Sequence, residues 1–156
     1  MQIVELHSLT EAQVSDLMDL MRQLTSDTQV TGDMLVRTVS TPGTHLFAAV
    51  DDACRIVGCA TLCVYCSPTG YKGAVEDVVV AQTHRGQGLG RKLLEALIDF
   101  AREEFGSVDL HLTSRPQRVA ANALYQSLGF EKRETNVYRM KIRPDLDKPK
   151  VSSSYA

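Results

Sequence analysis

The sequence predicts an α/β (α+β) fold in which a central sheet is flanked by about four helices. Three strand-like segments follow one another with only tight turns between them, which is typical of antiparallel strands. After residue 80 the chain alternates between helical and strand-like patterns, and a glycine-rich loop marks the change. The predicted order of elements is βααβββαβαβ.

Length and composition fit one folded domain. The chain has 156 residues, and 17 Lys and Arg against 19 Asp and Glu give a net charge of −2. A chain of this length buries enough surface to fold without a metal or a disulfide. The near-neutral charge argues against a nucleic-acid partner, and the 44% of hydrophobic residues argues against disorder. We predict a single domain over residues 1–143 and a Pro-, Lys- and Ser-rich tail over residues 144–156.

The sequence also bears on localisation. Residues 1–7 contain no basic segment followed by an apolar stretch, so no signal peptide is expected. No apolar run approaches the roughly 20 residues of a membrane span. We therefore expect a cytoplasmic protein that does not bind a membrane.

The first half of the chain begins with a short strand over Gln2 to Leu6. The stretch from Thr10 to Gln13 is a capping box that opens a helix, and a shorter helix starts near Thr31 or Gly32. The apolar residues of the first helix follow the 3.6-residue period: Val14, Leu17, Met18, Met21 and Leu24. The meander then covers three segments, about His45 to Val50, Arg55 to Cys66 and Lys72 to Val80.

In the second half, a long helix follows the glycine-rich loop and ends at Gly106. A strand over Val108 to Thr113, a helix over Gln117 to Leu128 and a last strand over Asn136 to Ile142 complete the predicted fold. If the last strand is an open edge, a second copy can cover it, which makes a homodimer a hypothesis of the sequence.

Four cysteines lie close together: Cys54, Cys59, Cys63 and Cys66. A zinc site would need a second pair of cysteines or a histidine pair nearby, and the sequence has neither. On the predicted strand, residues 63 and 66 point to opposite faces. We interpret them as reduced thiols and expect no metal.

The glycine-rich loop from Arg85 to Gly90 is a candidate anion site. Glycines permit tight turns, and their N–H groups converge with the positive end of the following helix. Arg91 and Lys92 add positive charge beside it. A P-loop would need Gly-Lys-Ser/Thr here, and a dinucleotide fingerprint would need a different glycine spacing after a parallel strand. The loop therefore matches neither of these nucleotide-binding motifs.

Two motifs resemble those of one known family. Arg85-x-x-Gly88-x-Gly90 is similar to the acetyl-CoA signature Q/R-x-x-G-x-G/A of the GNAT superfamily of acetyltransferases. The segment from Ala121 to Phe130 resembles the family pattern A-x-x-L-Y-x-x-x-G-F. The order of elements resembles that fold over residues 2–142.

The resemblance implies a mixed, mostly antiparallel sheet that is splayed in the middle, between the strand ending at Val80 and the strand Val108 to Thr113. Acetyl-CoA would lie in this split, with its pantetheine on the strand end and its pyrophosphate on the loop. The cofactor-binding residues would be Val78, Val79, Val80, Arg85, Gly86, Gln87, Gly88, Leu89, Gly90, Arg91 and Asn122. The reaction would be direct transfer of the acetyl group from the thioester to an amine.

Three residues are candidates for catalysis. Glu76 or Asp77 would accept the amine proton, directly or through a water. We favour Glu76, because Val78 and Val80 share its parity on the strand. Tyr125, which the family match places on the cofactor-facing helix, would donate a proton to the departing sulfur.

The sequence leaves the acceptor open. The Glu76–Asp77 stretch and the loop are similar to glucosamine-6-phosphate N-acetyltransferases, which makes that sugar an alternative acceptor. A non-catalytic acetyl-CoA-binding module and a purely structural partner are further alternatives. His111 can point to the acceptor side or be a partly exposed strand histidine. Arg115 and Arg118 can hold the 3′-phosphate of the cofactor or an anionic acceptor, or they can be solvated.

Overall fold

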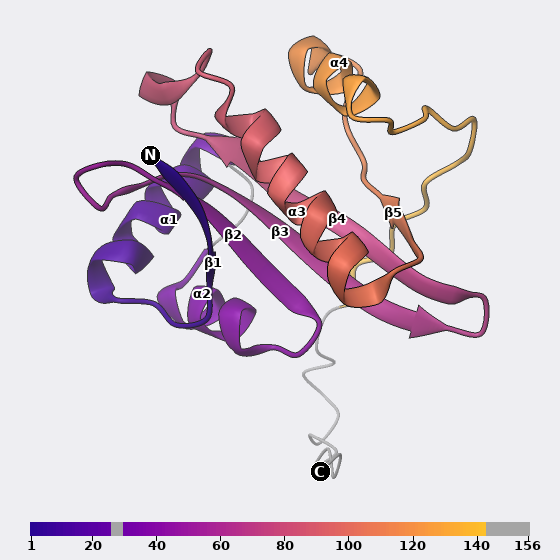
Figure 1. The fold of residues 1–156 in the computed structure, drawn as a ribbon, viewed down its shortest axis with the longest axis horizontal. Coiled ribbons are helices and arrows are strands. Elements are labelled where there is room, and N and C mark those ends of the chain that lie inside the picture. The colour runs from indigo at the N-terminus through magenta and orange to yellow at the C-terminus, as the bar shows by residue number, and fades with distance from the viewer. Residues whose placement is uncertain (26–29, 143–156) are drawn as a thin grey trace, which may run out of the picture.

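The computed structural model describes residues 1–25 and 30–142, so the predicted tail at 144–156 lies outside the described residues. Its centre is a five-stranded sheet in the order β1-β2-β3-β4-β5 (Figure 1). Neighbouring strands from β1 to β4 are antiparallel, and β5 is parallel to β4. The strands are β1 Gln2–Leu6, β2 Thr44–Val50, β3 Ile56–Ser67, β4 Gly70–Val80 and β5 Val108–His111. The mixed, mostly antiparallel sheet predicted from the sequence is confirmed.

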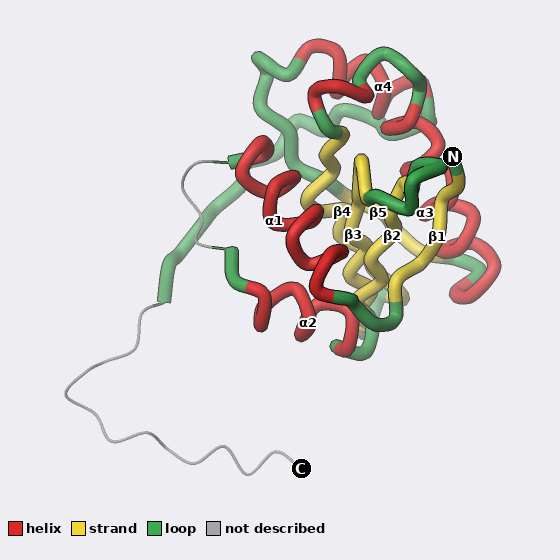
Figure 2. The backbone as a smooth tube through the Cα atoms, turned by 90° about the vertical axis from the view of Figure 1, so that its left-hand side faces the viewer, coloured by secondary structure: helices red, strands yellow, loops and turns green. Residues whose placement is uncertain are grey.

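Four α-helices flank the sheet, as predicted: α1 Glu11–Leu24, α2 Gly32–Ser40, α3 Leu89–Phe105 and α4 Val119–Ser127. Figure 2 shows α1 and α2 on one side of the strands and α3 on the other. A short 3-10 turn, Gln82–His84, joins β4 to the glycine loop. The chain therefore has three layers, and the loop that precedes α3 lies at the end of β4.

Side-chain caps fix the starts of α1 and α2, and the capping box of α1 is the one that the sequence predicts. The Thr10 hydroxyl accepts a hydrogen bond from the Gln13 amide, and the Thr10 amide donates to the Gln13 side chain at 2.9 Å. Thr31 caps α2 in the same way through the Met34 amide. Gly106 ends α3 with a φ of 67°, a conformation that favours glycine.

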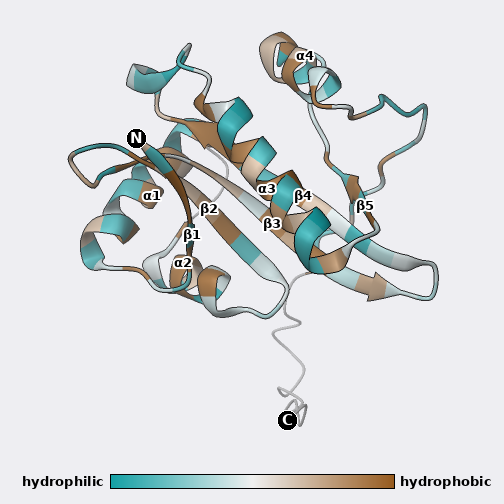
Figure 3. Ribbon diagram, in the orientation of Figure 1, coloured by the Kyte–Doolittle hydropathy of each residue, from teal (hydrophilic) through white to brown (hydrophobic). Residues whose placement is uncertain are grey.

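Two hydrophobic clusters pack on opposite faces of the sheet. The α3-side cluster joins α3 to β2, β3 and β4, and the α1-side cluster joins α1 and α2 to the other face. Hydrophilic residues of α3 lie on its outward face (Figure 3). The α3-side cluster includes Phe47, Leu62, Val75, Leu93, Leu94 and Leu97; the α1-side cluster includes Leu17, Leu20, Leu35, Leu46, Cys59 and Val79.

The prediction of a last strand over Asn136 to Ile142 is wrong, because residues 130–142 contain no helix or strand. The side chains of Val137, Tyr138, Met140 and Ile142 are between 72% and 90% exposed. Alternation of apolar and polar residues predicts a strand only where a neighbouring strand can pair with it. Within the described residues the sheet ends at β5, which also stops at His111 rather than Thr113. The homodimer hypothesis therefore loses the edge strand on which it rested.

A buried carboxylate fixes α1 to the start of β3. The Asp16 side chain is 5% exposed and accepts hydrogen bonds from the Arg55 guanidinium and, at 2.9 Å, from the Ile56 amide. The hydrogen bond from Arg55 holds the pKa of Asp16 below its usual range, although desolvation acts in the other direction. Asp16 therefore orients the helix that borders the sheet on the side away from α3.

We expect Asp16→Ala to lower the free energy of unfolding by about 2 kcal/mol at pH 7, because a guanidinium and a buried amide lose their charged acceptor. Since the folded-state pKa of Asp16 is depressed, this stabilisation is present above the ordinary aspartate pKa of about 3.9 and is lost as the pH falls below it. Urea denaturation at several pH values measures both effects. Asp19→Ala, which removes an exposed ion pair with Arg22 on the same helix, is the control and should change stability by less than about 1 kcal/mol. Equal losses in the two variants would contradict this account.

Candidate active site

Strands β4 and β5 stay together over only part of their length. Residues Tyr71 to Ala74 of β4 pair with Val108 to His111 of β5. From Val75 onward, the edge of β4 that faces β5 has no strand neighbour among the described residues. Backbone N–H and C=O groups on an unpaired edge are available to a ligand that adds like a strand. The two strands thus part where the family resemblance implies a split.

A β-bulge interrupts β4 at the carboxylate pair. Thr61 pairs with Glu76, whereas Cys59, two residues earlier on β3, pairs with Val79, three residues later on β4. The extra residue lies at Asp77, whose φ of 50° is rare for a residue other than glycine. Bulges of this kind bend a strand and change the direction of its side chains, often next to active sites.

The bulge overturns one prediction. Thr61 and its partner Glu76 lie on the sheet face away from α3, because both neighbours of Thr61 on β3 belong to the α3-side cluster. Val78 and Val80 pack against the α3-side cluster. Glu76 therefore does not share a face with Val78 and Val80, and the parity argument that favoured it was wrong. Strict alternation along a strand fails as soon as one residue is inserted.

Burial raises the pKa values of the two carboxylates, and their charges raise the pKa values of nearby groups. Desolvation raises the pKa of Glu76, as does the charge of Asp77, whereas His111 lowers it; desolvation also raises the pKa of Asp77. Burial raises the pKa of the half-buried Cys63 thiol, and the charges of Glu76 and Asp77 add to this effect. Burial, with a contribution from Asp77, raises the pKa of Cys59 to about 12. Both carboxylates thus influence groups on the face away from α3, and a raised pKa makes a carboxylate a stronger proton acceptor.

The glycine loop has the geometry of an anion site. Gly86 and Gly88 have φ values of 77° and 75°, which L side chains rarely adopt, and Gly88 is the N-terminal cap of α3. The Lys92 amide makes the first helical bond, to the Gly88 carbonyl. The amides of residues 89–91 therefore lack helical acceptors and point out of the helix N-terminus, where an anion is stabilised.

The cations around the loop are held by neighbours. Arg85 Nε donates to the Val80 carbonyl at 3.2 Å, which joins the loop to the end of β4. Arg91 donates to the Ser127 hydroxyl at 2.6 Å and pairs with Glu95, so it connects the start of α3 with the end of α4. Gln87 is exposed at the tip of the loop. The sequence singled out Arg91 but gave no sign of its contact with Ser127.

Helix α4 brings Tyr125 against the α3-side cluster, with its ring 6.2 Å from that of Phe130. Desolvation raises the pKa of the Tyr125 hydroxyl, and the nearby charge of Arg118 acts in the other direction. A phenol with a raised pKa keeps its proton at neutral pH and remains a donor.

The β5–α4 loop contains contacts that the sequence did not predict. Asn122 Nδ2 donates to the Arg115 carbonyl at 3.0 Å, which fixes the loop, and Arg118 Nη2 lies 3.4 Å from the Leu24 carbonyl at the end of α1. The Ser114 hydroxyl oxygen is buried and has no hydrogen-bond partner among the described residues. Arg118 thus links α4 to the helix on the other face of the sheet.

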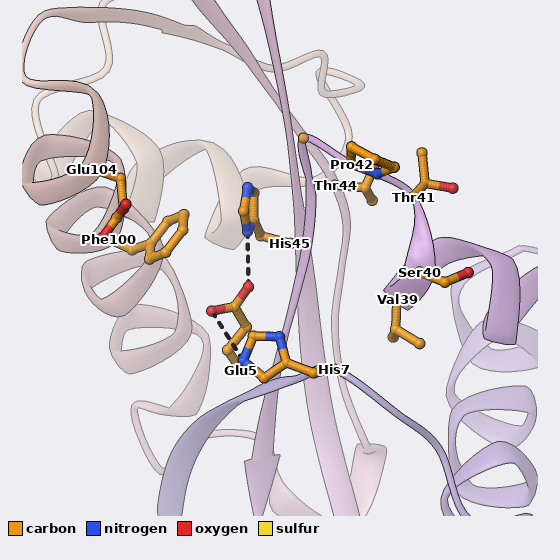
Figure 4. A pocket seen from close by; sticks show the side chains of 11 residues that line it. Glu5, His7, Val39, Ser40, Thr41, Pro42, Thr44, His45, Phe100 and Glu104 are labelled. Carbon is orange, nitrogen blue, oxygen red and sulfur yellow. Dashed lines mark hydrogen bonds and ion pairs between the residues drawn. The ribbon is translucent and has the colours of Figure 1, made fainter. Parts of the chain in front are cut away.

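A separate pocket of about 420 Å³ lies between β1, the loop after α2 and the end of α3 (Figure 4). His45 Nδ1 lies 2.8 Å from Glu5, and its ring centroid lies 4.5 Å from that of Phe100. None of the residues predicted for catalysis or cofactor binding lines this pocket. These contacts join β1, β2 and α3 near the start of β2. The end of β2 is the part of that strand nearer the glycine loop.

The described residues form neither a metal cluster nor a membrane-spanning helix. Over residues 1–25 and 30–142, no group of three or more His, Cys, Asp or Glu side chains has an arrangement that could hold a metal ion. In the same part of the chain, no helix is both long and apolar enough to cross a bilayer. All four cysteines are free; Cys59 is buried, Cys63 is half-buried, and Cys54 and Cys66 are exposed.

Comparison with known proteins gives a consistent result. The family model described as "Acetyltransferase (GNAT) family" matches residues 9–130. The N-alpha-acetyltransferase RimI of Mycobacterium tuberculosis is 33% identical over 96 residues, 62% of this chain and 58% of that protein. A probable glucosamine 6-phosphate N-acetyltransferase of Drosophila melanogaster is 30% identical over 108 residues, 66% of this chain and 48% of that protein.

A putative acetyltransferase from Agrobacterium tumefaciens has a similar solved structure. Its TM-score is 0.77 at 23% identity, and the match covers 90% of this chain and all of that one, so it supports the fold. The matches to the curated relatives are shorter than those proteins. For three of these relatives the matched segment spans between 15% and 58% of the relative's length, which is less than two thirds in each case.

We expect Glu76→Gln to raise the melting temperature at pH 7.5, because desolvation penalises the ionised carboxylate in the folded state. A folded-state pKa above the unfolded value means that this penalty is absent below the ordinary glutamate pKa of about 4.3 and grows as the pH rises through it. Thermal denaturation at pH 4 and pH 7.5 measures the difference. Glu103→Gln, at an exposed carboxylate on α3, is the control and should show no such pH dependence. A lower melting temperature for Glu76→Gln at pH 7.5 would contradict the prediction.

Proposed function

Because this chain belongs to the GNAT acetyltransferase family, we propose that it transfers the acetyl group of acetyl-CoA directly to a primary amine of a small molecule or a protein. The observation that carries this proposal is the position of the Glu76–Asp77 bulge. It lies in the part of β4 that has lost β5 as a neighbour, and the glycine loop follows at the end of the same strand. An anion site, an open strand edge and a proton acceptor are therefore contiguous.

Acetyl-CoA, the substrate that the family implies, would occupy this contiguous site. Its pyrophosphate would bind the amides of residues 86–91 at the start of α3. Its pantetheine amides would pair with the backbone of Val78, Val79 and Val80 along the open edge. The thioester would then lie near the bulge. Asn122 and Tyr125 on α4 would border the pantetheine from the side of the α3-side cluster.

The chemistry needs a neutral amine, a polarised carbonyl and a proton for the leaving thiolate. The Glu76–Asp77 pair would supply the base, either directly or through an intermediary, as the amine nitrogen bonds to the carbonyl carbon. A backbone amide near Val78 would polarise the carbonyl oxygen, since a bulge leaves backbone groups outside the strand ladder. As the carbon–sulfur bond breaks, the Tyr125 hydroxyl would give its proton to the sulfur and regain one from water.

Two acceptor classes have specific support. The relative from Mycobacterium tuberculosis is named for acetylation of an α-amine, which favours a protein or peptide N-terminus. The relative from Drosophila melanogaster is named for glucosamine 6-phosphate, and its match covers a larger share of this chain. A sugar amine with a phosphate would need a cation at the acceptor side, and Arg118 extends toward α1 there.

The proposal is tested by release of free CoA thiol from acetyl-CoA in the presence of an amine panel. The panel contains glucosamine 6-phosphate, amino acids, polyamines and peptides with free N-termini. We expect one class to stimulate thiol release and mass spectrometry to show a 42 Da gain on that amine. Tight binding of acetyl-CoA with no stimulation by any amine would instead favour a non-catalytic binding module. Absence of acetyl-CoA binding would favour a purely structural partner.

We expect Tyr125→Phe to lower kcat by about 100-fold, because the leaving thiolate loses its proton donor. The dissociation constant for acetyl-CoA, measured by calorimetry, should change by less than about threefold, since the ring itself remains. Tyr138→Phe removes the hydroxyl of an exposed tyrosine in residues 130–142 and is the matched control. Equal turnover in Tyr125→Phe and the wild-type chain would eliminate Tyr125 as the donor.

A further inference from the structure

The sheet face away from α3 carries an ordered set of polar side chains around Ala74. Ala74 pairs with Cys63 on β3 and with His111 on β5. One step along the ladder in either direction, Glu76 pairs with Thr61, and Lys72 pairs with both Tyr65 and Asp109. Residues two apart on a strand share a face, so these side chains surround the methyl group of Ala74 on one surface. We refer to Cys63, Tyr65, Ala74, Glu76 and His111 as the open face.

The helices leave the open face accessible. The residues of β3 and β4 in the α1-side cluster are Ile56, Cys59 and Val79, which lie nearer the glycine-loop end of the two strands. None of the open-face residues belongs to this cluster. Tyr65 is 52% exposed, and Glu76 and His111 are exposed as well. A molecule in solution can therefore reach them from the side opposite to α3.

His111 lies where the two strands part. It is the last residue of β5 and belongs to the last pair of the β4–β5 ladder. Glu76 follows two residues after its partner Ala74, so Glu76 and His111 are diagonal neighbours across the start of the split, within reach of long side chains. The Tyr65 ring lies edge-on to the His111 ring at 6.5 Å and borders it on the other side.

Some of the charged groups around His111 have ion-pair partners and others do not. Lys72 Nζ pairs with Asp109 at 3.0 Å, and the charge of Arg133 also acts on Asp109, so the Asp109 carboxylate has cationic neighbours. Glu76 and Asp77 form no salt bridge with any described residue. Tyr65 and Cys63 from β3 are the other titratable groups on this face. The carboxylate without an ion-pair partner that lies diagonally across the split from His111 is therefore Glu76, at the point where an acceptor would approach the thioester.

We propose that His111 is a further catalytic residue, which accepts the proton of the acceptor amine while Glu76 stabilises the imidazolium that forms. This inference rests on the proposed function and assigns to His111 the proton acceptance that was given there to the carboxylate pair. The amine nitrogen bonds to the carbonyl carbon, and its proton moves to the unprotonated ring nitrogen of His111. The carbon–sulfur bond breaks, the sulfur takes its proton as above, and the imidazolium later loses its proton to water. Imidazole is well suited to this role near neutral pH.

The test compares kcat/KM against pH for the wild-type chain, His111→Gln and His7→Gln, with the amine that gives the fastest thiol release in the panel. We expect His111→Gln to lower kcat/KM by about 100-fold at neutral pH and to remove the inflection on the acidic side of the profile. The acetyl-CoA dissociation constant should stay unchanged. His7→Gln alters an exposed histidine beside Glu5, away from the open face, and should behave like the wild-type chain.

Rescue by a small molecule separates proton transfer from a structural effect. Imidazole added to His111→Ala should restore part of the lost rate in proportion to its concentration, whereas it should not stimulate His7→Gln. Loss of activity without rescue and without a change in the shape of the pH profile would overturn the role of His111. So would activity of His111→Gln within twofold of the wild-type chain. If the wild-type chain acetylates no amine of the panel, the proposed function itself fails, and this inference fails with it.

Discussion

Among the described residues, strand β4 has two neighbouring strands over its first part and one over the rest, and the other features of the site depend on this difference. Backbone N–H and C=O groups must find hydrogen-bond partners, so the unpaired edge beyond Ala74 has to be satisfied by water or by a ligand. The bulge, the carboxylate pair and the glycine loop all follow along the same strand. The bulge and the carboxylate pair are therefore positioned along the unpaired edge of β4, and the glycine loop follows at its end.

The two faces of the sheet carry different helices, and contacts at one end of the sheet join them. The α3-side cluster supports the loop and α4, and the α1-side cluster supports α1 and α2. Near the end of β4, the Gln82 amide donates to the Gln23 side chain at 3.0 Å, and Arg118 reaches the Leu24 carbonyl. The C-terminal end of α1 is therefore held by the 3-10 turn that follows β4 and by the residue that precedes α4, the helix that carries Tyr125.

Features that depend on neighbours in the sequence were predictable, and those that depend on pairing were not. The capping box at Thr10 and the helix end at Gly106 follow from local chemistry and were predicted at the correct residues, and the start of α2 was predicted to within one residue, at Thr31 or Gly32. The bulge at Asp77 depends on how β4 pairs with β3, so strand alternation placed Glu76 on the wrong face. The alternating pattern at 136–142 has the composition of a strand but no pairing partner in the structure. The sequence left His111 open between the acceptor side and a partly exposed strand position, and its place at the last pair of the β4–β5 ladder became known only when β5 was aligned with β4.

The division of the core into two clusters has a consequence for how such a chain can change over generations. Substitutions in separate clusters that share no contacts have nearly additive effects on stability. Away from Ala81, which packs against both clusters, replacements in α1 and α2 can therefore accumulate without repacking Leu93, Leu94 and Leu97 beneath the glycine loop. One side of the sheet can therefore vary while the other stays constant, and the loss of stability from each replacement is limited to one cluster.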